Sequence, residues 1–370
     1  MISQLCDEEW ALLKRLLPTD LDERAKTCHA LRRARGVKDA ETLLRLLFLH
    51  ISGGLSLEQT ALRAATLGIA KVSAVALFKR LRGARSWLED LCAQLISKHT
   101  THSPVIWPLP GRTYRVLDAS DIREPGAAGS SWRLHYSITL PGLRCDFARF
   151  TPHTVGERLQ NLPLQKTDIV LADRAYGKRG QMAWLIDCGA DAVIRLHPPS
   201  FPIMERHAED TEATDLPVDW LARLDTLPPL QPAEWIVGFS SGTKRYKIRI
   251  CAIRKSATAA AQARHKVQLE ARKKGRVSAE QTLRMADFIV IATTLSARAL
   301  STARVLELYR CRWQVELAFK RLKSLLDMSA VPKTDEQSAR SWMQGKLLES
   351  LLIERLLEQS RALSPWGYEL

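Results

Sequence analysis

The chain has 370 residues, of which 46% are hydrophobic and 26% are charged, and its formal net charge is +15. This apolar share is enough for a substantial core, and the length predicts about two or three domains. The positive charge predicts a polyanionic partner, most simply nucleic acid. No apolar run approaches the roughly 18 residues of a membrane span, and no signal-peptide pattern opens the chain, so neither a membrane protein nor an exported one is predicted.

The cysteines give the same indication about location. All seven are scattered and none forms a C-x-x-C pair, which argues against a structural zinc site. An odd number of cysteines without an export signal fits a reducing cytoplasm. We therefore expect a soluble cytoplasmic protein that handles nucleic acid.

The N-terminal part of the chain is predicted to be entirely helical. Leu57–Leu67, a break at Gly68 and the basic run Val72–Leu81 have the outline of a helix-turn-helix. The candidate DNA contacts on the second helix are Lys79 and Arg80. Two short helices around a glycine also occur in plain helical bundles, so simple packing remains an open alternative.

After a proline-containing linker at 100–112, the hydrophobic period changes from helical to strand-like. A Pro-Gly turn joins the second predicted strand to the third. The predicted elements are strands at Thr113–Ala119, Trp132–Leu140 and Leu143–Phe150, a helix at Val155–Leu162, a strand at Asp168–Ala172, a helix at Gly177–Cys188 and a strand at Ala192–Leu196. This order is the outline of an α/β, ribonuclease H-like fold, in which helices flank a mixed central sheet.

Two carboxylates are predicted at strand ends that would be neighbours in such a sheet. Asp118 ends the first strand and Asp173 follows the fourth, so the two could share one metal ion. Asp121 is a rival for the role of Asp118, and Asp173 could instead cap the next helix. Arg195 either lines this site or covers the surface.

Residues 198–287 interrupt the alternating pattern. Prolines mark an irregular beginning, and Tyr246–Ile253 alternates as a strand. A basic segment that is predicted to be helical follows between Arg264 and Arg284. Phe288–Thr293 returns as a strand. The last predicted element is an amphipathic helix, Ser338–Glu358, which is expected to pack on the core.

The segment Ala297–Ala330 contains neither proline nor glycine and is predicted to carry one long helix. At about 100° per residue, Tyr309, Arg312, Glu316 and Lys323 fall on one stripe roughly 60° wide. A carboxylate flanked by two cations and a phenol is a set of side chains that could bind a metal-bound phosphodiester. Glu316 would bind the metal, and Arg312 and Lys323 would contact phosphate oxygens. From this segment alone, a solvated helix face with ordinary charge pairs is an equally good interpretation.

Asp118, Asp173 and Glu316 together form the donor set of two-metal phosphoryl transfer, in which two divalent ions stabilise the attacking and leaving oxygens. Such hard oxygen ligands suit Mg²⁺ or Mn²⁺ rather than zinc. The sequence has no serine nucleophile elbow, zinc-protease helix motif, P-loop or dinucleotide fingerprint. No other catalytic class therefore competes well.

The spacing Tyr309-x2-Arg312-x3-Glu316-x6-Lys323 resembles the signature of the DDE transposases of the insertion-sequence-four family of bacteria. The run around Asp118 resembles the strand with the first aspartate of that family, and the run around Asp173 resembles the second. The resemblance covers roughly residues 40–360. It implies a ribonuclease H-like core with a β-rich insertion.

The resemblance also implies a function. The chain would be a cut-and-paste transposase that binds terminal inverted repeats, cleaves at the transposon ends and joins the 3′-OH ends to target DNA. The three acids would hold two ions of Mg²⁺ or Mn²⁺. A homodimer would form the synaptic complex on double-stranded DNA. The protein would lie in a bacterial cytoplasm, associated with the nucleoid. Tyr309, Arg312 and Lys323 would contact phosphates near the transposon end. Phe288 matches an aromatic that holds a flipped base in some members, although a core aromatic is the alternative.

The corresponding domain division has four parts. They are a helical DNA-binding domain at 1–103, a catalytic core at 112–197 and 288–335, an insertion subdomain at 198–287 and a C-terminal helical segment at 336–370. Two other functions stay open: an inactive or co-opted DNA-binding protein, and a related metal-dependent nuclease without strand transfer.

Overall fold

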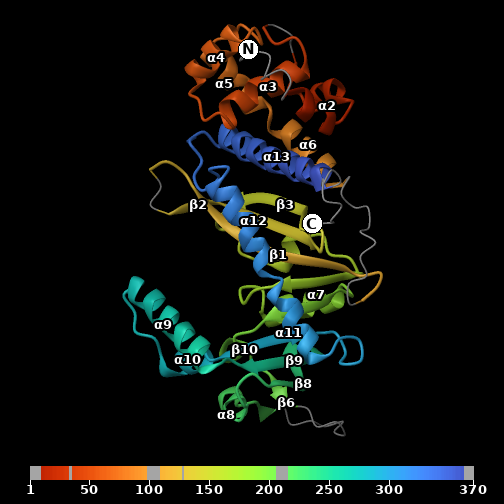
Figure 1. Cartoon of the computed structure of the whole chain (residues 1–370), viewed down its shortest axis with the longest axis vertical. Coiled ribbons are helices and arrows are strands. Elements are labelled where there is room, and N and C mark those ends of the chain that lie inside the picture. Colours follow the sequence, from red (N-terminus) through yellow and green to blue (C-terminus); the bar gives the residue numbers. More distant parts are fainter. Residues whose placement is uncertain (1–9, 33–35, 98–108, 127–128, 206–215, 362–370) are drawn as a thin grey trace.

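The computed structural model describes residues 10–32, 36–97, 109–126, 129–205 and 216–361. The molecule is elongated, with a group of N-terminal helices above one end of a mixed sheet (Figure 1). The sheet has ten strands in the order β3-β2-β1-β4-β5-β10-β9-β8-β6-β7. The α/β class predicted from the sequence is confirmed. Within the described ranges, no helix has both the length and the hydropathy needed to cross a membrane.

The helices before the sheet are α2 (Leu21–Thr27), α3 (Ala40–Ile51), α4 (Leu57–Thr66), α5 (Ala74–Gly83) and α6 (Arg85–Ser97). α4 and α5 are the two helices expected around Gly68, whose φ of +70° favours glycine. Ser56 and Gln59 form a capping box at the start of α4, and Ser73 caps α5. DNA binding by this pair stays a prediction. The predicted linker at 100–112 lies largely outside the described residues.

The first half of the sheet follows the predicted order. β1 (Thr113–Arg123), β2 (Ser130–Leu140) and β3 (Arg144–Pro152) are antiparallel, whereas β4 (Asp168–Ala172) runs parallel to β1 and β5 (Asp191–Arg195) parallel to β4. Only Thr113–Val116 of β1 pairs with β4, so β1 extends well beyond it. Asp118 consequently lies in the middle of β1. Its predicted position at the strand end is wrong, because pairing with β2 carries β1 on to Arg123.

The helix predicted at Val155–Leu162 is also wrong. This stretch is an irregular loop with one 3₁₀ turn, η1 (Leu159–Asn161). Side chains from other elements hold its backbone: Arg133 Nη1 donates to the Val155 carbonyl at 3.0 Å, and the Leu159 N–H donates to the Gln181 side chain of α7 (Arg179–Asp187) at 2.8 Å. These tertiary hydrogen bonds replace the helical ones.

Residues 198–287 extend the same sheet. β9 (Lys244–Arg254) pairs with β10 (Phe288–Thr293), which pairs with β5, and β8 (Pro232–Ser241) lies on the other side of β9. β8 was not predicted, because it begins with a proline and its first half is poorly buried. The remaining elements are η2 (Pro198–Ser200), β6 (Met204–Glu205), β7 (Leu216–Pro217), α8 (Trp220–Asp225), α9 (Ala257–Lys273) and α10 (Glu280–Met285).

The helix predicted to carry Tyr309, Arg312, Glu316 and Lys323 is divided in two, so the prediction of one continuous helix is wrong. α11 (Thr302–Arg310) ends just before Cys311, and α12 (Trp313–Ser324) begins just after Arg312. At the break the Arg312 N–H donates to the Tyr309 carbonyl at 3.0 Å, an i→i−3 bond of the tighter 3₁₀ type. No proline or glycine marks this position.

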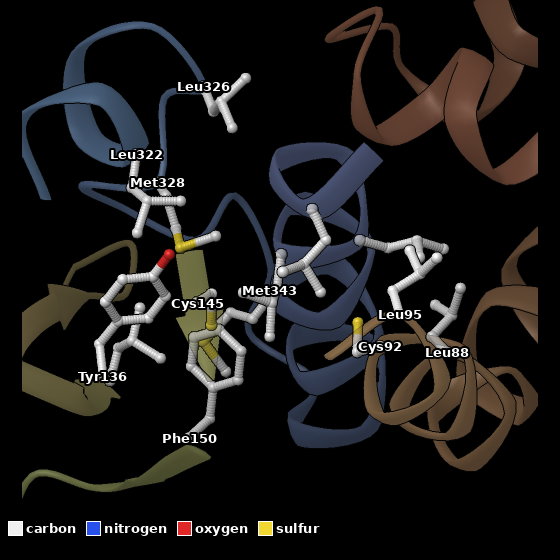
Figure 2. Close-up of a cluster of buried hydrophobic side chains, with 14 of the residues drawn as sticks. Leu88, Cys92, Leu95, Tyr136, Cys145, Phe150, Leu322, Leu326, Met328 and Met343 are labelled. Atoms are coloured by element: carbon white, nitrogen blue, oxygen red, sulfur yellow. The ribbon is translucent and has the colours of Figure 1, made fainter. Parts of the chain in front are cut away.

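The long helix α13 (Glu336–Arg361) confirms the prediction of a C-terminal helix that packs on the core. It lies between α6 and the sheet (Figures 1 and 2). The Tyr136 hydroxyl donates to Glu354 of α13 at 3.1 Å, and the Cys145 N–H donates to the same carboxylate at 3.2 Å. Apolar side chains on both sides of α13 form one buried cluster, drawn in part in Figure 2, so this helix joins the N-terminal helices to the sheet.

The loop after β4, which begins at Asp173, packs tightly against β5 at Gly177. A Cβ added to Gly177 would lie 2.7 Å from the Arg195 carbonyl oxygen and 2.9 Å from Leu196 Cδ2. Backbone atoms cannot easily move out of the way, so only glycine fits this position.

We therefore expect Gly177→Ala to push this loop away from β5 and to lower the free energy of unfolding by about 1–3 kcal/mol. Urea denaturation of the two proteins measures the difference. Gly180→Ala is the matched control, because a Cβ there meets nothing within 4 Å and lies in α7. The control should be neutral or up to about 1 kcal/mol more stable. Equal stability of the two variants would contradict the close contact at Gly177.

Candidate active site

Asp118 and Asp173 lie on one face of the sheet, at the point where β1 and β4 part. Asp118 is two residues after Val116 and therefore lies on the same side of β1. Asp173 is likewise two residues after Leu171 and lies on the side of β4 that carries Leu171. Both of those apolar residues belong to the same buried cluster as residues of α12 and α13. Because β1 and β4 are neighbouring strands, no strand lies between the two carboxylates, and they are within electrostatic reach of each other.

The surroundings of Asp118 disfavour its negative charge. Burial raises the pKa of Asp118 to about 7, and the charges of Asp173 and Glu157 raise it further, while the Ala119 N–H and Arg312 oppose the rise. The Ala119 N–H donates to Asp118 Oδ1 at 2.8 Å. A buried carboxylate beside a second carboxylate is an arrangement that a bound cation would stabilise.

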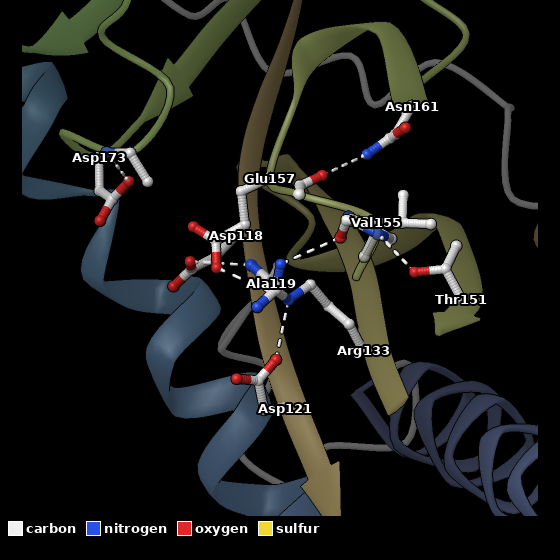
Figure 3. A network of polar contacts seen from close by, with 12 residues as sticks. Asp118, Ala119, Asp121, Arg133, Thr151, Val155, Glu157, Asn161 and Asp173 are labelled. Atoms are coloured by element: carbon white, nitrogen blue, oxygen red, sulfur yellow. Dashed lines mark hydrogen bonds and ion pairs between the residues drawn. The ribbon is translucent and has the colours of Figure 1, made fainter. Parts of the chain in front are cut away.

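Glu157 is an acidic residue of the site that the sequence interpretation missed. It lies in the loop after β3, close to Asp118 (Figure 3). Burial raises the pKa of Glu157, Arg133 opposes the rise, and the charge of Asp173 adds to it. Glu157 stands in the stretch wrongly predicted to be a helix, and no local pattern marks it.

Arg133 of β2 separates Asp121 from the pair formed by Asp118 and Asp173. Arg133 Nε lies 2.8 Å from Asp121 Oδ1 and 3.9 Å from Glu157 Oε1 (Figure 3). Asp121 is thus engaged in an ion pair, whereas Asp118 is within electrostatic reach of Asp173.

Arg312 connects Asp118 with Glu316. One guanidinium nitrogen of Arg312 forms a short ion pair with Glu316 Oε1, and the other lies 3.9 Å from Asp118 Oδ2. The side chains of Arg312 and Asp118 are 17% and 19% exposed, but that of Glu316 is 56% exposed. Glu316 consequently faces the aspartates through Arg312 and does not join them directly.

Tyr309 and Arg195 complete this side of the site. Arg312 Cζ lies 5.9 Å from the centroid of the Tyr309 ring. Burial raises the pKa of Tyr309, and Arg312 and Arg195 oppose the rise. Burial lowers the pKa of Arg195, while Tyr309 and Asp173 favour its charged form. Two guanidinium groups and a phenol are thereby placed beside the aspartates, a set suited to phosphate oxygens.

The other predicted site residues lie elsewhere. Lys323 is two turns beyond Glu316 on α12, about 10 Å along the helix. Phe288 is 3% exposed and belongs to the core cluster on the opposite face of the sheet, under Arg254. This placement fits the alternative of a core aromatic. Lys79 and Arg80 are on α5, which α13 separates from the sheet (Figure 1).

The donor set can be compared with the needs of a divalent cation. Among the described residues, no group of three His, Cys, Asp or Glu side chains is arranged to hold a metal ion. Asp118 and Asp173 nevertheless offer the hard oxygen donors that Mg²⁺ prefers, and a bound cation would offset the burial and the neighbouring carboxylates that raise the pKa of Asp118. The two aspartates have the chemistry that a divalent cation needs, and Glu316 is engaged in the ion pair with Arg312.

The family model and the relatives that match this chain all belong to transposases. Residues 134–352 match the model of the family described as "Transposase DDE domain". The chain is 32% identical over 356 residues to the putative transposase InsL for insertion sequence element IS186A of Escherichia coli strain K12, covering 94% of this chain and 93% of that protein. It is equally 32% identical, over 357 residues, to the transposase for insertion sequence element IS421 of Escherichia coli, with the same coverage.

A solved structure is more distantly similar. It is the cryo-EM structure of the piggyBac transposase synaptic complex with hairpin DNA, with a TM-score of 0.47 and 8% identity over 95% of this chain and 76% of that one.

The pKa of Asp118 leads to a prediction about stability. An unfolded Asp has a pKa of about 3.9. The folded protein therefore holds a proton that the unfolded chain releases between about pH 4 and 7, and stability falls as the pH rises through this window. We expect Asp118→Asn to stabilise the protein by about 1–3 kcal/mol at pH 8 in EDTA, with the gain shrinking toward zero near pH 4.

Denaturant unfolding at several pH values measures this gain. Asp121→Asn is the control, since it removes a carboxylate that is paired with Arg133 and should lose stability at pH 8. A gain for Asp118→Asn that did not depend on pH would show that the ionisation of Asp118 is not its source.

Proposed function

The chain belongs to the DDE-domain transposases of bacterial insertion sequences, enzymes that cleave DNA strands and transfer them, and from this we propose that it works by a cut-and-paste route. In this route the protein binds the terminal inverted repeats, cleaves at the transposon ends and joins the freed 3′-OH ends to target DNA. A homodimer would hold two ends together. The observation that carries the proposal is the pairing of Asp118 with Asp173 on one sheet face, with Arg312 connecting Glu316 to them.

The fold proposed for the catalytic part is ribonuclease H-like. The strand order β3-β2-β1-β4-β5, with three antiparallel strands followed by two parallel ones, supports it. We keep the predicted division into 1–103, 112–197 with 288–335, 198–287 and 336–370. In that division the insertion shares the sheet of the core, since β9 pairs with β10.

DDE transposases generally use divalent metal ions. We propose that Asp118, Asp173 and Glu316 hold Mg²⁺ or Mn²⁺, two ions in all. Bound there, the ions would activate the attacking water or 3′-OH and stabilise the leaving oxygen. Arg195, Tyr309 and Lys323 would contact DNA phosphates, and Lys79 and Arg80 would contact the transposon end. Phe288 is not among these contacts because its ring is buried.

Arg312 is proposed to change partner when DNA binds. A phosphate diester is a good hydrogen-bond partner for a guanidinium, and Arg312 already lies at the aspartates. A phosphate at this point would draw Arg312 from Glu316, and the Glu316 carboxylate could then turn toward Asp118 and Asp173. The three acids would therefore assemble only on DNA.

The acidic residues have a direct test. Asp118→Ala, Asp173→Ala and Glu316→Ala should each lower cleavage by at least about 100-fold while end binding changes little, because each removes a metal ligand and no phosphate contact. The substrate is a labelled duplex with the terminal repeat of the element, and products are resolved on a denaturing gel. Glu307→Ala is the control, since Arg304 is the one ion-pair partner of Glu307 among the described residues and both side chains are exposed on α11.

Each result has a consequence. A variant of the three that still nicked the duplex at the wild-type rate would lose its assigned role. Cleavage by the wild-type protein without joining would favour a nuclease, and end binding without cleavage in either Mg²⁺ or Mn²⁺ would favour an inactive copy.

The exchange of partners by Arg312 is tested without catalysis. In the DNA-free protein, Glu316→Gln should leave the affinity for Mn²⁺ unchanged, because Glu316 is held by Arg312. In an Arg312→Gln background, the same substitution should weaken Mn²⁺ binding by about fivefold. Electron paramagnetic resonance of free Mn²⁺ measures all four proteins. Equal effects of Glu316→Gln in the two backgrounds would contradict the exchange.

A further inference from the structure

Residues 255–287, here called the basic arm, leave the sheet between β9 and β10 and project from the body of the molecule (Figure 1). Their longest element is α9, in which only Ala260 is buried. The arm is fixed at its base, where Arg264 Nη1 lies 2.6 Å from Asp287 Oδ1 and the Lys255 N–H donates to the Asp287 carbonyl at 2.9 Å. Most helices in proteins are stabilised chiefly by tertiary packing, and α9 has little of it, so packing alone does not explain the arm.

The charge of the arm lies toward its outer end. Between residues 257 and 276 there are six lysines and arginines and one carboxylate, Glu270. Beyond Arg264 the cations are Lys266, Arg272, Lys273, Lys274 and Arg276, and all five are exposed. None of the five has an acidic partner among the described residues. Cations in the last turn of a helix are stabilised by the helix dipole, which explains some of the charge at the C-terminal end of α9. This effect does not extend to Lys266 or Arg276.

The apolar side chains of the arm argue against a protein partner. Leu269 is 41% exposed and Val277 is 97% exposed, and two such side chains are too few for an apolar docking surface. A second copy of a chain with a net charge of +15 would also repel a cationic arm. A polyanion fits the observed charge, and the family acts on DNA.

The base of the arm is close to the candidate active site. The arm runs directly into β10, which pairs with β5 so that Ile291 lies opposite Arg195, and the Lys255 N–H is hydrogen-bonded to the residue just before β10. Burial lowers the pKa of Lys255 to about 8, and the charges of Arg195 and Arg174 lower it further. Arg195 is in turn within electrostatic reach of Asp173. Cations therefore continue from the acidic pair past Arg195 to the start of α9. The helix is about 25 Å long at 1.5 Å per residue, which corresponds to about seven base pairs of duplex.

We propose that the basic arm docks on duplex DNA and contacts the phosphates of the same duplex whose scissile phosphate lies at Asp118 and Asp173. The contacts are to the backbone and do not depend on base sequence. This inference rests on the proposed function, because it needs DNA at the acidic site.

The test is the salt dependence of binding. In the variant Lys273→Gln, Lys274→Gln, Arg276→Gln, the slope of log Kobs against log salt should fall by about 2–3, since each lost phosphate contact removes about 0.9. Two duplexes of equal length are compared, one with the terminal repeat and one of unrelated sequence, and both should show the change. Hydroxyl-radical footprinting should show about seven protected base pairs that the variant no longer protects.

The matched control removes the same charge elsewhere. Lys166→Gln, Lys247→Gln, Arg298→Gln changes three exposed cations outside the arm and should leave the slope almost unchanged. Thermal unfolding shows that both variants are folded, which is expected because none of the six side chains is buried.

The outcomes separate this proposal from the proposed function. Equal slopes for the arm variant and the control would overturn the arm proposal and leave the function standing. The same result together with a weaker self-association of the arm variant in sedimentation would identify the arm as a contact between copies. Failure of the wild-type protein to bind either duplex would overturn both.

Discussion

The short parallel pairing between β1 and β4 is the constraint on which the candidate site depends. It holds the two strands together only as far as Val116, after which β4 ends and β1 continues on the strength of its pairing with β2. Asp118 therefore remains fixed in a strand while Asp173 begins a loop, and the two carboxylates lie within electrostatic reach of each other.

Packing of α12 and α13 fixes the position of Glu316 relative to the two aspartates. The Phe319 ring lies 5.6 Å from that of Tyr136, and Glu354 accepts a hydrogen bond from the same tyrosine, so both helices are positioned by one residue of β2. Glu316 is one turn before Phe319 on α12, and its distance from the aspartates follows from this contact. The stability of the core and the geometry of the site are thus determined by the same packing.

The sequence predicted the features that local patterns encode. Alternation in β1, β2 and β3 and the buried run of β4 placed Asp118 and Asp173 on adjacent strands, and the spacing from Tyr309 to Lys323 identified the helical residues. The break after Arg310 could not be predicted, because 3₁₀ hydrogen bonds replace helical ones there without proline or glycine. Glu157 was missed because its loop is held by Arg133 from a distant strand, and no periodicity in a single segment encodes such a contact.

The strength of the ion pair between Arg312 and Glu316 decides how far it can control the site. Glu316 is 56% exposed, and a pair this open contributes only about 0–1 kcal/mol in water. In the proposed exchange, this pair keeps Glu316 bound to Arg312 in the DNA-free protein. A DNA phosphate can replace Glu316 easily, because the phosphate carries a full negative charge and the Arg312 guanidinium is less exposed than the Glu316 carboxylate. A difference of about 1 kcal/mol is only about fivefold in an equilibrium constant, so the pair alone cannot restrict cleavage to the correct DNA. Most of that selectivity must come from the binding contacts that bring the phosphate to Arg312.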